Sequence, residues 1–132
     1  MKFLLDTDTC IYALKQNSTV LKHLLGHSRE DVAVSVITEG ELRTGAAKST
    51  AAVKTLRLVE NFLRPLSIVE FTSQDATSYA QVRAKLEEAG TPIGPLDTLI
   101  AAQAVARKLV LVSNNEREFR RVAGLRIDNW TS

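Results

Sequence analysis

The sequence predicts an α/β protein of three layers (α/β/α), in which a central, mostly parallel five-stranded sheet lies between helices. Segments of strand type alternate with segments of helix type along the chain, and this order produces parallel strands. The strand segments are also short and almost continuously apolar, as at residues 32–37, which is typical of strands covered on both faces. We expect residues 1–132 to form a single domain of this type.

The first strand comprises residues 3–5 and leads directly into Asp6 and Asp8. Parallel sheets bind ligands outside the carboxyl ends of their strands, so a strand that ends in carboxylates predicts a functional site at that edge. A short helix is expected over residues 9–16, with Asp8 as its N-cap, because aspartate accepts hydrogen bonds from the free N–H groups of a first helical turn.

A second short helix is predicted over residues 19–27, where apolar side chains recur at helical spacing. His23 and His27 share one face of this helix. Two histidines without a third ligand nearby make a poor zinc site, so we interpret them as solvated surface residues.

Residues 32–37 are expected to form a central strand, and a helix follows from Thr38 toward residue 48. Thr38 and Glu41 have the spacing of a capping box, in which both side chains bind N–H groups at the start of a helix. A further helix is predicted over residues 49–64, which carry an apolar stripe on one side.

The second half of the chain continues the alternation of strands and helices. We predict strands at residues 66–71, 109–112 and, at the sheet edge, 125–127, and helices at residues 73–89, 98–107 and 116–122. A loop containing two prolines and a glycine, at residues 91–95, leads to Asp97.

Composition narrows the class of protein further. The 17 basic and 15 acidic residues give a net charge of +2, which is too small to indicate a nucleic-acid partner by itself. The single cysteine, Cys10, excludes an internal disulfide and fits a reducing compartment. No apolar run approaches the roughly 18 residues of a membrane span, and the first residues lack a signal-peptide core. We therefore expect a cytoplasmic protein with no membrane partner.

Several polar side chains stand where predicted strands end and predicted helices begin. Each has a structural explanation by itself, since acids and amides cap helices, and Asn115 and Glu118 repeat the capping-box spacing. However, Asp6, Asp97 and Asn115 all lie at junctions on the same predicted edge, with Glu41 one turn inside its helix. Carboxylates that lie close together raise one another's pKa, and a cation among them removes this cost.

The candidate ligands at this edge are all oxygen donors, with no cysteine or convincing histidine among them. Such a set suits Mg²⁺ or Mn²⁺ rather than zinc. Mg²⁺ keeps several of its waters, and it can activate one of them while it neutralises charge on a phosphate. The residues alone therefore indicate metal-dependent phosphoryl chemistry.

Four segments carry motifs in a recognisable order and spacing. They are residues 4–8 (LLDTD), 35–42 (SVITEGEL) with 45–49 (GAAKS), 94–101 (GPLDTLIA) and 112–119 (VSNNEREF). Together they resemble the PIN-domain family, in particular the VapC-type toxins of bacterial type II toxin-antitoxin pairs. The resemblance covers essentially the whole chain.

The resemblance implies a small endoribonuclease with a five-stranded parallel sheet, active with Mg²⁺ or Mn²⁺. It also implies a homodimer that is inhibited by a VapB-type antitoxin, whose tail covers the active site. The toxin is then expected to bind operator DNA only through this antitoxin. Related toxins cut structured RNAs such as tRNA, so tRNA is the expected class of substrate.

Carried over by residue, the family's metal-binding aspartates fall on Asp6 and Asp97, and its conserved glutamate falls on Glu41, which helps to hold the metal or orients the attacking water. Many PIN domains have a fourth acid where this chain has Asn115. The toxins most similar to this sequence often have asparagine there as well. Glu118, one turn further on, is a candidate for the missing carboxylate.

Other polar residues of the motifs have expected roles around this set. Thr7 and Ser113 are expected to donate hydrogen bonds to the metal-binding side chains. Arg117, Arg120 and Arg121 are close enough to the fourth motif to reach substrate phosphates. A solvated helix face is the simpler explanation for these three arginines.

Two other functions remain open at this stage. Asp6 and Asp8 have the Asp-x-Asp spacing of haloacid-dehalogenase-type phosphatases, but Cys10 departs from that family's motif and its late acidic pair has no counterpart after Ser113. Asn115 also permits a non-catalytic, dimeric module that binds the antitoxin and has a decayed site. The presence of all three other acids argues against that alternative.

Overall fold

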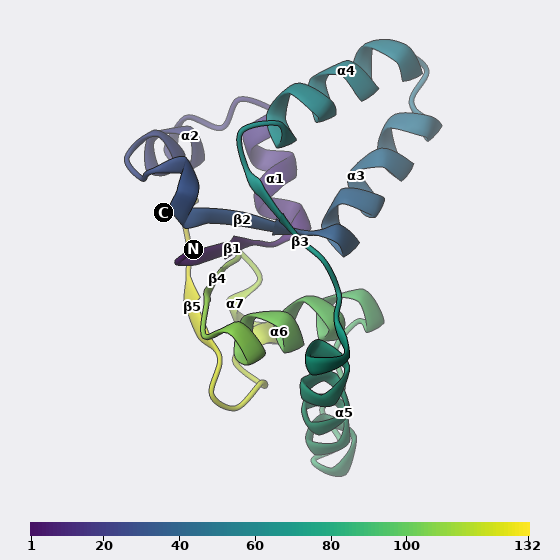
Figure 1. Ribbon diagram of the computed structural model, residues 1–132, viewed down its shortest axis with the longest axis vertical. Helices are drawn as coiled ribbons and strands as arrows, with labels where there is room; N and C mark the ends of the chain where they lie inside the picture. Colours follow the sequence, from purple (N-terminus) through teal and green to yellow (C-terminus); the bar gives the residue numbers. More distant parts are fainter.

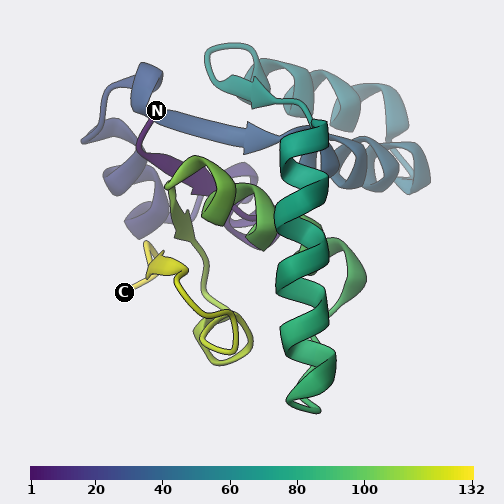
Figure 2. The same cartoon turned by 60° about the horizontal axis from the view of Figure 1, so that its bottom comes forward.

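The structure is a computed structural model that describes the whole chain, Met1–Ser132. Five strands form one sheet in the order β3-β2-β1-β4-β5, and every neighbouring pair is parallel. Helices cover both faces of the sheet (Figures 1 and 2), so the predicted three-layer fold is confirmed. None of the helices combines the length and the apolar character needed to cross a membrane.

The elements follow one another with short connections. In chain order they are β1 (Phe3–Leu5), α1 (Thr7–Leu14), α2 (Ser18–Leu25), the 3₁₀ turn η1 (Arg29–Asp31), β2 (Val32–Ser35), α3 (Val36–Lys48), α4 (Ala52–Leu63), β3 (Ser67–Val69), α5 (Ser73–Glu88), α6 (Pro95–Arg107), β4 (Val110–Val112), α7 (Glu116–Phe119) and β5 (Arg126–Asp128).

The strands separate two apolar cores. On one face, Leu4, Ala33 and Leu111 pack with side chains of α5, α6 and α7. On the other face, Leu5 and Val34 pack with side chains of α1, α2, α3 and α4. Figure 1 shows these two groups of helices on opposite sides of the sheet. Because both faces are covered, side chains of either orientation must be apolar, which explains the continuous apolar runs of the strands.

Helix α1 begins two residues earlier than predicted. Its N-cap is Asp6, whose Oδ1 accepts a hydrogen bond of 2.8 Å from the N–H of Thr9. The assignment of Asp8 as the cap was therefore wrong, and Asp8 lies exposed in the first turn. The helix starts directly after the strand because the buried Asp6 carboxylate takes its hydrogen bonds from that first turn.

Helix α3 also begins two residues before the predicted position. Val36 and Ile37 are β-branched and were assigned to the strand, but Ser35 ends β2 and caps the helix by accepting from the N–H of Ile37. The proposed capping box of Thr38 and Glu41 is wrong for this reason, since both residues lie inside the helix. Tertiary packing outweighs the strand preference of the two β-branched residues here.

His23 of α2 and His27, just beyond the end of this helix, do not project freely into solvent as expected. Both His23 and His27 stack on Trp130, with ring centroids 5.6 and 5.3 Å from that of the indole. Phe3 of β1 packs edge-on against the same indole, at 5.3 Å between centroids. Trp130 is almost fully buried, so the last residues of the chain are attached to α2 and to the first strand.

An ion pair with a buried carboxylate joins the start of α5 to the end of α6. Asp75 is 1% exposed and completes a capping box with Thr72 at the start of α5. Arg107, in the last turn of α6, donates to Asp75 Oδ2 at 3.0 Å. Burial acts to raise the pKa of Asp75, but hydrogen bonds from the N–H of Thr72 and from Arg107 hold the pKa below its ordinary value.

We expect Asp75→Asn to lower the free energy of unfolding by about 1–3 kcal/mol at neutral pH, because it leaves Arg107 without its charged partner. A carboxyl whose pKa is lower in the folded chain stabilises the fold above its ordinary pKa, and this stabilisation is lost as the pH falls through the lowered value. The difference between the two proteins in urea unfolding should therefore shrink below about pH 4.

The exposed i,i+4 pair between Arg83 and Glu87 supplies the control. Glu87→Gln should cost less than about 1 kcal/mol at neutral pH, as exposed ion pairs usually do. Equal losses of unfolding free energy in the two variants would show that burial of Asp75 does not strengthen its ion pair.

Candidate active site

The carboxyl ends of β1, β2 and β4 lie at one edge of the sheet, and Asp6 lies at its centre. Asp6 is 3% exposed, and its backbone N–H donates to the carbonyl of Val112 at the end of β4. Burial raises the pKa of the Asp6 carboxyl, and hydrogen bonds from the Ser113 side chain and from Thr9 partly offset this rise. The fold thus holds a carboxylate in a place where its charge is poorly solvated.

Glu41 reaches the same edge from α3. Its Oε1 accepts a hydrogen bond of 2.6 Å from the hydroxyl of Thr7, which also lies 3.1 Å from the hydroxyl of Thr38. Thr7 stands in the first turn of α1, so this contact joins α1 to α3 next to Asp6. The hydrogen bond fixes one oxygen of Glu41, while Oε2 has no hydrogen-bond partner.

Asp97 occupies the first turn of α6, where Pro95 at the N-terminus starts the helix earlier than the sequence predicted. Its pKa is raised from 3.8 to about 7, chiefly by burial and then by the charge of Glu118 and a hydrogen bond with it. The charges of Asp6 and Glu41 raise it further. The negative charges of the other three carboxylates therefore all act on Asp97.

Glu118 belongs to α7 and faces the start of α6. Its Oε1 accepts from the N–H of Gly94 at 2.9 Å, and its Oε2 accepts from the side-chain amide of Asn115. Asn115 makes no side-chain cap to the helix backbone, so the capping box expected for these two residues is wrong. The amide of Asn115 instead orients the carboxylate of Glu118.

Four of the five candidate residues thus lie together in the structure, and the fifth supports one of them. The carboxylates of Asp6, Glu41, Asp97 and Glu118 gather at the sheet edge, and Asn115 contacts Glu118. No group of three or more His, Cys, Asp or Glu side chains is arranged to hold a metal ion in this structure.

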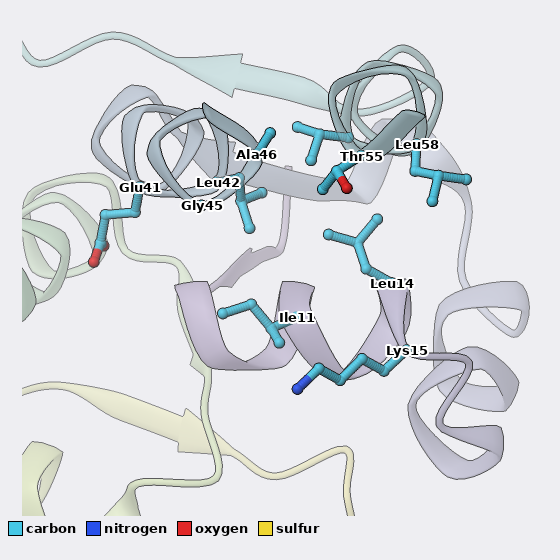
Figure 3. Close-up of a pocket in the computed structure, with 10 residues that line it drawn as sticks. Ile11, Leu14, Lys15, Glu41, Leu42, Gly45, Ala46, Thr55 and Leu58 are labelled. Atoms are coloured by element: carbon cyan, nitrogen blue, oxygen red, sulfur yellow. The ribbon is translucent and has the colours of Figure 1, made fainter. Parts of the chain in front are cut away.

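An apolar groove that was not predicted from the sequence lies beside these acids. The groove has a volume of about 340 Å³ and lies between α1, α3 and α4, where Ile11, Leu14, Leu42 and Leu58 line it. Figure 3 shows Glu41 at one end of it, with the carboxylate pointing away from the apolar side chains. The spacing of these apolar residues is equally compatible with core packing, so the sequence offered no signal for an open groove.

Comparison with known proteins decides the family. A family model described as the PIN domain matches residues 3–125. The chain belongs to the PIN-domain family. This membership decides against the phosphatase alternative, and it agrees with the order of the five strands and with the four gathered acids.

Within the PIN-domain family, the chain is a VapC-type endoribonuclease toxin. It is 41% identical to the tRNA(fMet)-specific endonuclease VapC of Salmonella typhimurium, over 98% of each chain. It is 37% identical to ribonuclease VapC2 of Haemophilus influenzae, also over 98% of each. A crystal structure of DNA-bound VapBC from Salmonella typhimurium contains a chain that superposes with a TM-score of 0.95, at 40% identity over 98% of each chain.

Thr7→Val should lower the rate of RNA cleavage by roughly 10- to 100-fold, because the valine has the same shape and cannot hold Glu41. Single-turnover cleavage of RNA at saturating protein measures this loss. Thr77→Val on α5 is the matched control, since the Thr77 hydroxyl is exposed and bonds only the carbonyl of Ser73. A Thr7→Val protein as active as the control would show that cleavage does not depend on the hydrogen bond from Thr7 to Glu41.

Asp97→Asn should stabilise the metal-free PIN domain at neutral and higher pH. An acid whose pKa is raised on folding stabilises the fold at low pH, and that contribution is lost as the pH rises from about 4 to about 7. We expect a gain of roughly 1–2 kcal/mol for the variant at about pH 8, allowing for partial exposure of the carboxylate, and none near pH 4. Urea unfolding in the presence of a chelator tests this, and a gain independent of pH would contradict it.

Proposed function

We propose that this VapC-type toxin cleaves structured RNA, with tRNA as the class of substrate, and that it requires Mg²⁺ or Mn²⁺. The gathering of four carboxylates at the carboxyl edge of the sheet is the observation that carries this proposal. Such a concentration of negative charge is costly, as the raised pKa of Asp97 indicates, and a bound cation would remove the cost.

The residues present fit a hard divalent cation. Every donor at the site is an oxygen, which suits Mg²⁺ or Mn²⁺. Asp6 and Asp97 would hold the ion directly, with Glu41 as a further ligand or as the group that orients water. When bound, the ion supplies positive charge for the scissile phosphate and lowers the pKa of a coordinated water.

The protein's own side chains have distinct parts in this proposal. Glu41, held through Oε1 by Thr7, accepts a hydrogen bond from the attacking water through its unpaired Oε2. Glu118 supplies the fourth carboxylate that other PIN domains carry at the position of Asn115, and Asn115 keeps that carboxylate oriented. In this way an amide and a glutamate one turn apart together replace a single acid.

Substrate recognition rests on basic residues near α7. Arg121 donates to the carbonyl of Pro92, and Arg120 pairs with Glu116 at 3.7 Å. Arg117 is exposed and makes neither a hydrogen bond nor an ion pair within the chain, so we propose it as a contact for RNA phosphates. The name of the Salmonella typhimurium relative, tRNA(fMet)-specific endonuclease, supports tRNA as the class of substrate.

A VapB-type antitoxin is the proposed partner, and it would be the component through which the complex binds operator DNA. The solved VapBC of Salmonella typhimurium and of Rickettsia felis were both crystallised with DNA, which supports this assignment. The groove between α1, α3 and α4 is apolar and ends at Glu41, so an apolar stretch of the antitoxin tail fits there and would cover the acids. We further propose a homodimer that acts on RNA in the cytoplasm.

The proposal is tested with purified, antitoxin-free protein and total tRNA that includes initiator tRNA. We expect discrete cleavage with Mg²⁺, none with a chelator, and at least a roughly hundredfold lower rate for Asp97→Asn. Glu88→Gln, which removes one exposed charge at the end of α5, is the control and should cut at the wild-type rate. Intact RNA from folded wild-type protein under all conditions would instead favour the non-catalytic antitoxin-binding module.

A further inference from the structure

Two helices carry acids into the site from opposite sides of a hollow. Glu41 is on α3 and Asp97 is in the first turn of α6. Beside Glu41, an open hollow of about 510 Å³ separates α3 from Leu96. Contacts away from this hollow therefore contribute to the relative position of the two helices.

A buried glutamine joins the two helices away from this hollow. Gln103 of α6 is completely buried, and its Oε1 accepts a hydrogen bond of 2.5 Å from the hydroxyl of Ser35. The same hydroxyl accepts from the N–H of Ile37 and so caps α3. The Nε2 of Gln103 donates to the carbonyl of Glu70, just beyond β3, at 3.1 Å, and Arg107 at the end of α6 donates to the same carbonyl.

This amide is the sole hydrogen-bonded connection between α6 and α3 with its cap. It lies six residues after Asp97, and Ser35 lies six residues before Glu41. At the rise of an α-helix, each acid is then about 9 Å along its helix from the connection. A small tilt of either helix about this point would move the carboxylates relative to each other.

We propose that Gln103 is a positioning residue for the acidic site, which fixes the separation of Glu41 and Asp97 by holding the N-terminus of α3 and the end of β3 to α6. This inference rests on the proposed function, because it assigns to Gln103 a role toward the cation that those acids hold. Gln103 itself touches neither substrate nor ion.

The chemistry of the side chain suits this role. Its amide accepts a hydrogen bond from Ser35 and donates one to Glu70 at the same time, so the two bonds together fix the orientation of the amide. An apolar side chain of similar length would fill the same space but would leave the Ser35 hydroxyl without an acceptor, and the Glu70 carbonyl would keep only its bond from Arg107. A carboxylate would present an acceptor to the Glu70 carbonyl, which has no proton to donate.

The test compares Gln103→Met with Ser78→Ala. Ser78 donates a buried hydrogen bond of 2.8 Å to the carbonyl of Ala102, from the α5 side of the same helix, and makes no contribution to the connection with α3. Both variants lose buried hydrogen bonds and should unfold at lower urea concentrations than the wild type. Only Gln103→Met should bind Mn²⁺ more weakly, by about tenfold in calorimetric titration of the antitoxin-free protein.

Cleavage kinetics provide the second readout. Gln103→Met should lower kcat for tRNA with KM unchanged, because the RNA-binding surface is untouched, whereas Ser78→Ala should retain the wild-type kcat. Should Gln103→Met fail to fold, Ser35→Ala breaks the same connection by removing one atom. Ser35→Ala should likewise weaken Mn²⁺ binding, because it removes the bond to Gln103 together with the cap of α3.

Wild-type Mn²⁺ affinity and kcat in Gln103→Met, together with lower stability, would overturn the inference and leave Gln103 as a structural residue only. Equal losses of Mn²⁺ affinity in Ser78→Ala would also overturn it, since general loosening of α6 would then be the cause. A wild-type protein that neither binds Mn²⁺ nor cleaves RNA would overturn the proposed function and this inference with it, and it is recognised before any variant is compared.

Discussion

Mutual repulsion among carboxylates at one edge of the sheet is the constraint on which the rest of this structure depends. A parallel sheet brings the carboxyl ends of β1, β2 and β4 to one edge, and helices α1 and α3 start there at once. The fold offsets three of the charges with hydrogen-bond donors: Thr9 and Ser113 for Asp6, Thr7 for Glu41, and the backbone of Gly94 for Glu118. Asp97 shares a hydrogen bond with Glu118 instead, and burial together with the neighbouring negative charges raises its pKa to about 7. A cation at this edge would offset the negative charges that raise the pKa of Asp97.

The layers and the parallel sheet were predictable because they depend on local signals. Apolar runs of three to six residues define strands covered on both faces, and they alternate with helical segments over most of the chain. Helix starts were less predictable. Val36 and Ile37 have strand preferences, and Asp8 is as good a cap as Asp6 by residue type. Only the burial of Asp6 and Ser35 in the complete fold decides where the two helices begin.

The candidate site acids were predicted from their places at strand and helix junctions and from the family resemblance, but their contacts were not. Thr7 meets Glu41 across 34 positions, and Gly94 meets Glu118 across 24. Neither contact leaves a periodic pattern in the sequence, because each involves one backbone or hydroxyl group chosen by tertiary packing. The same is true of Gln103, which in the sequence is one polar residue within an apolar helix. Sequence therefore indicates which chemistry is present, and the structure indicates how its parts are supported.

The position of β1 also has a consequence for synthesis on the ribosome. This strand is made first but lies at the centre of the sheet, where Leu5 pairs with Val112 and the hydroxyl of Thr9 bonds the carbonyl of the same residue. Contacts so distant in sequence form slowly and only after the later segment has left the ribosome tunnel. A nascent chain that ends before β4 holds Asp6 without the strand that buries it. The edge of the sheet that carries the acids is therefore complete only when most of the chain has been synthesised.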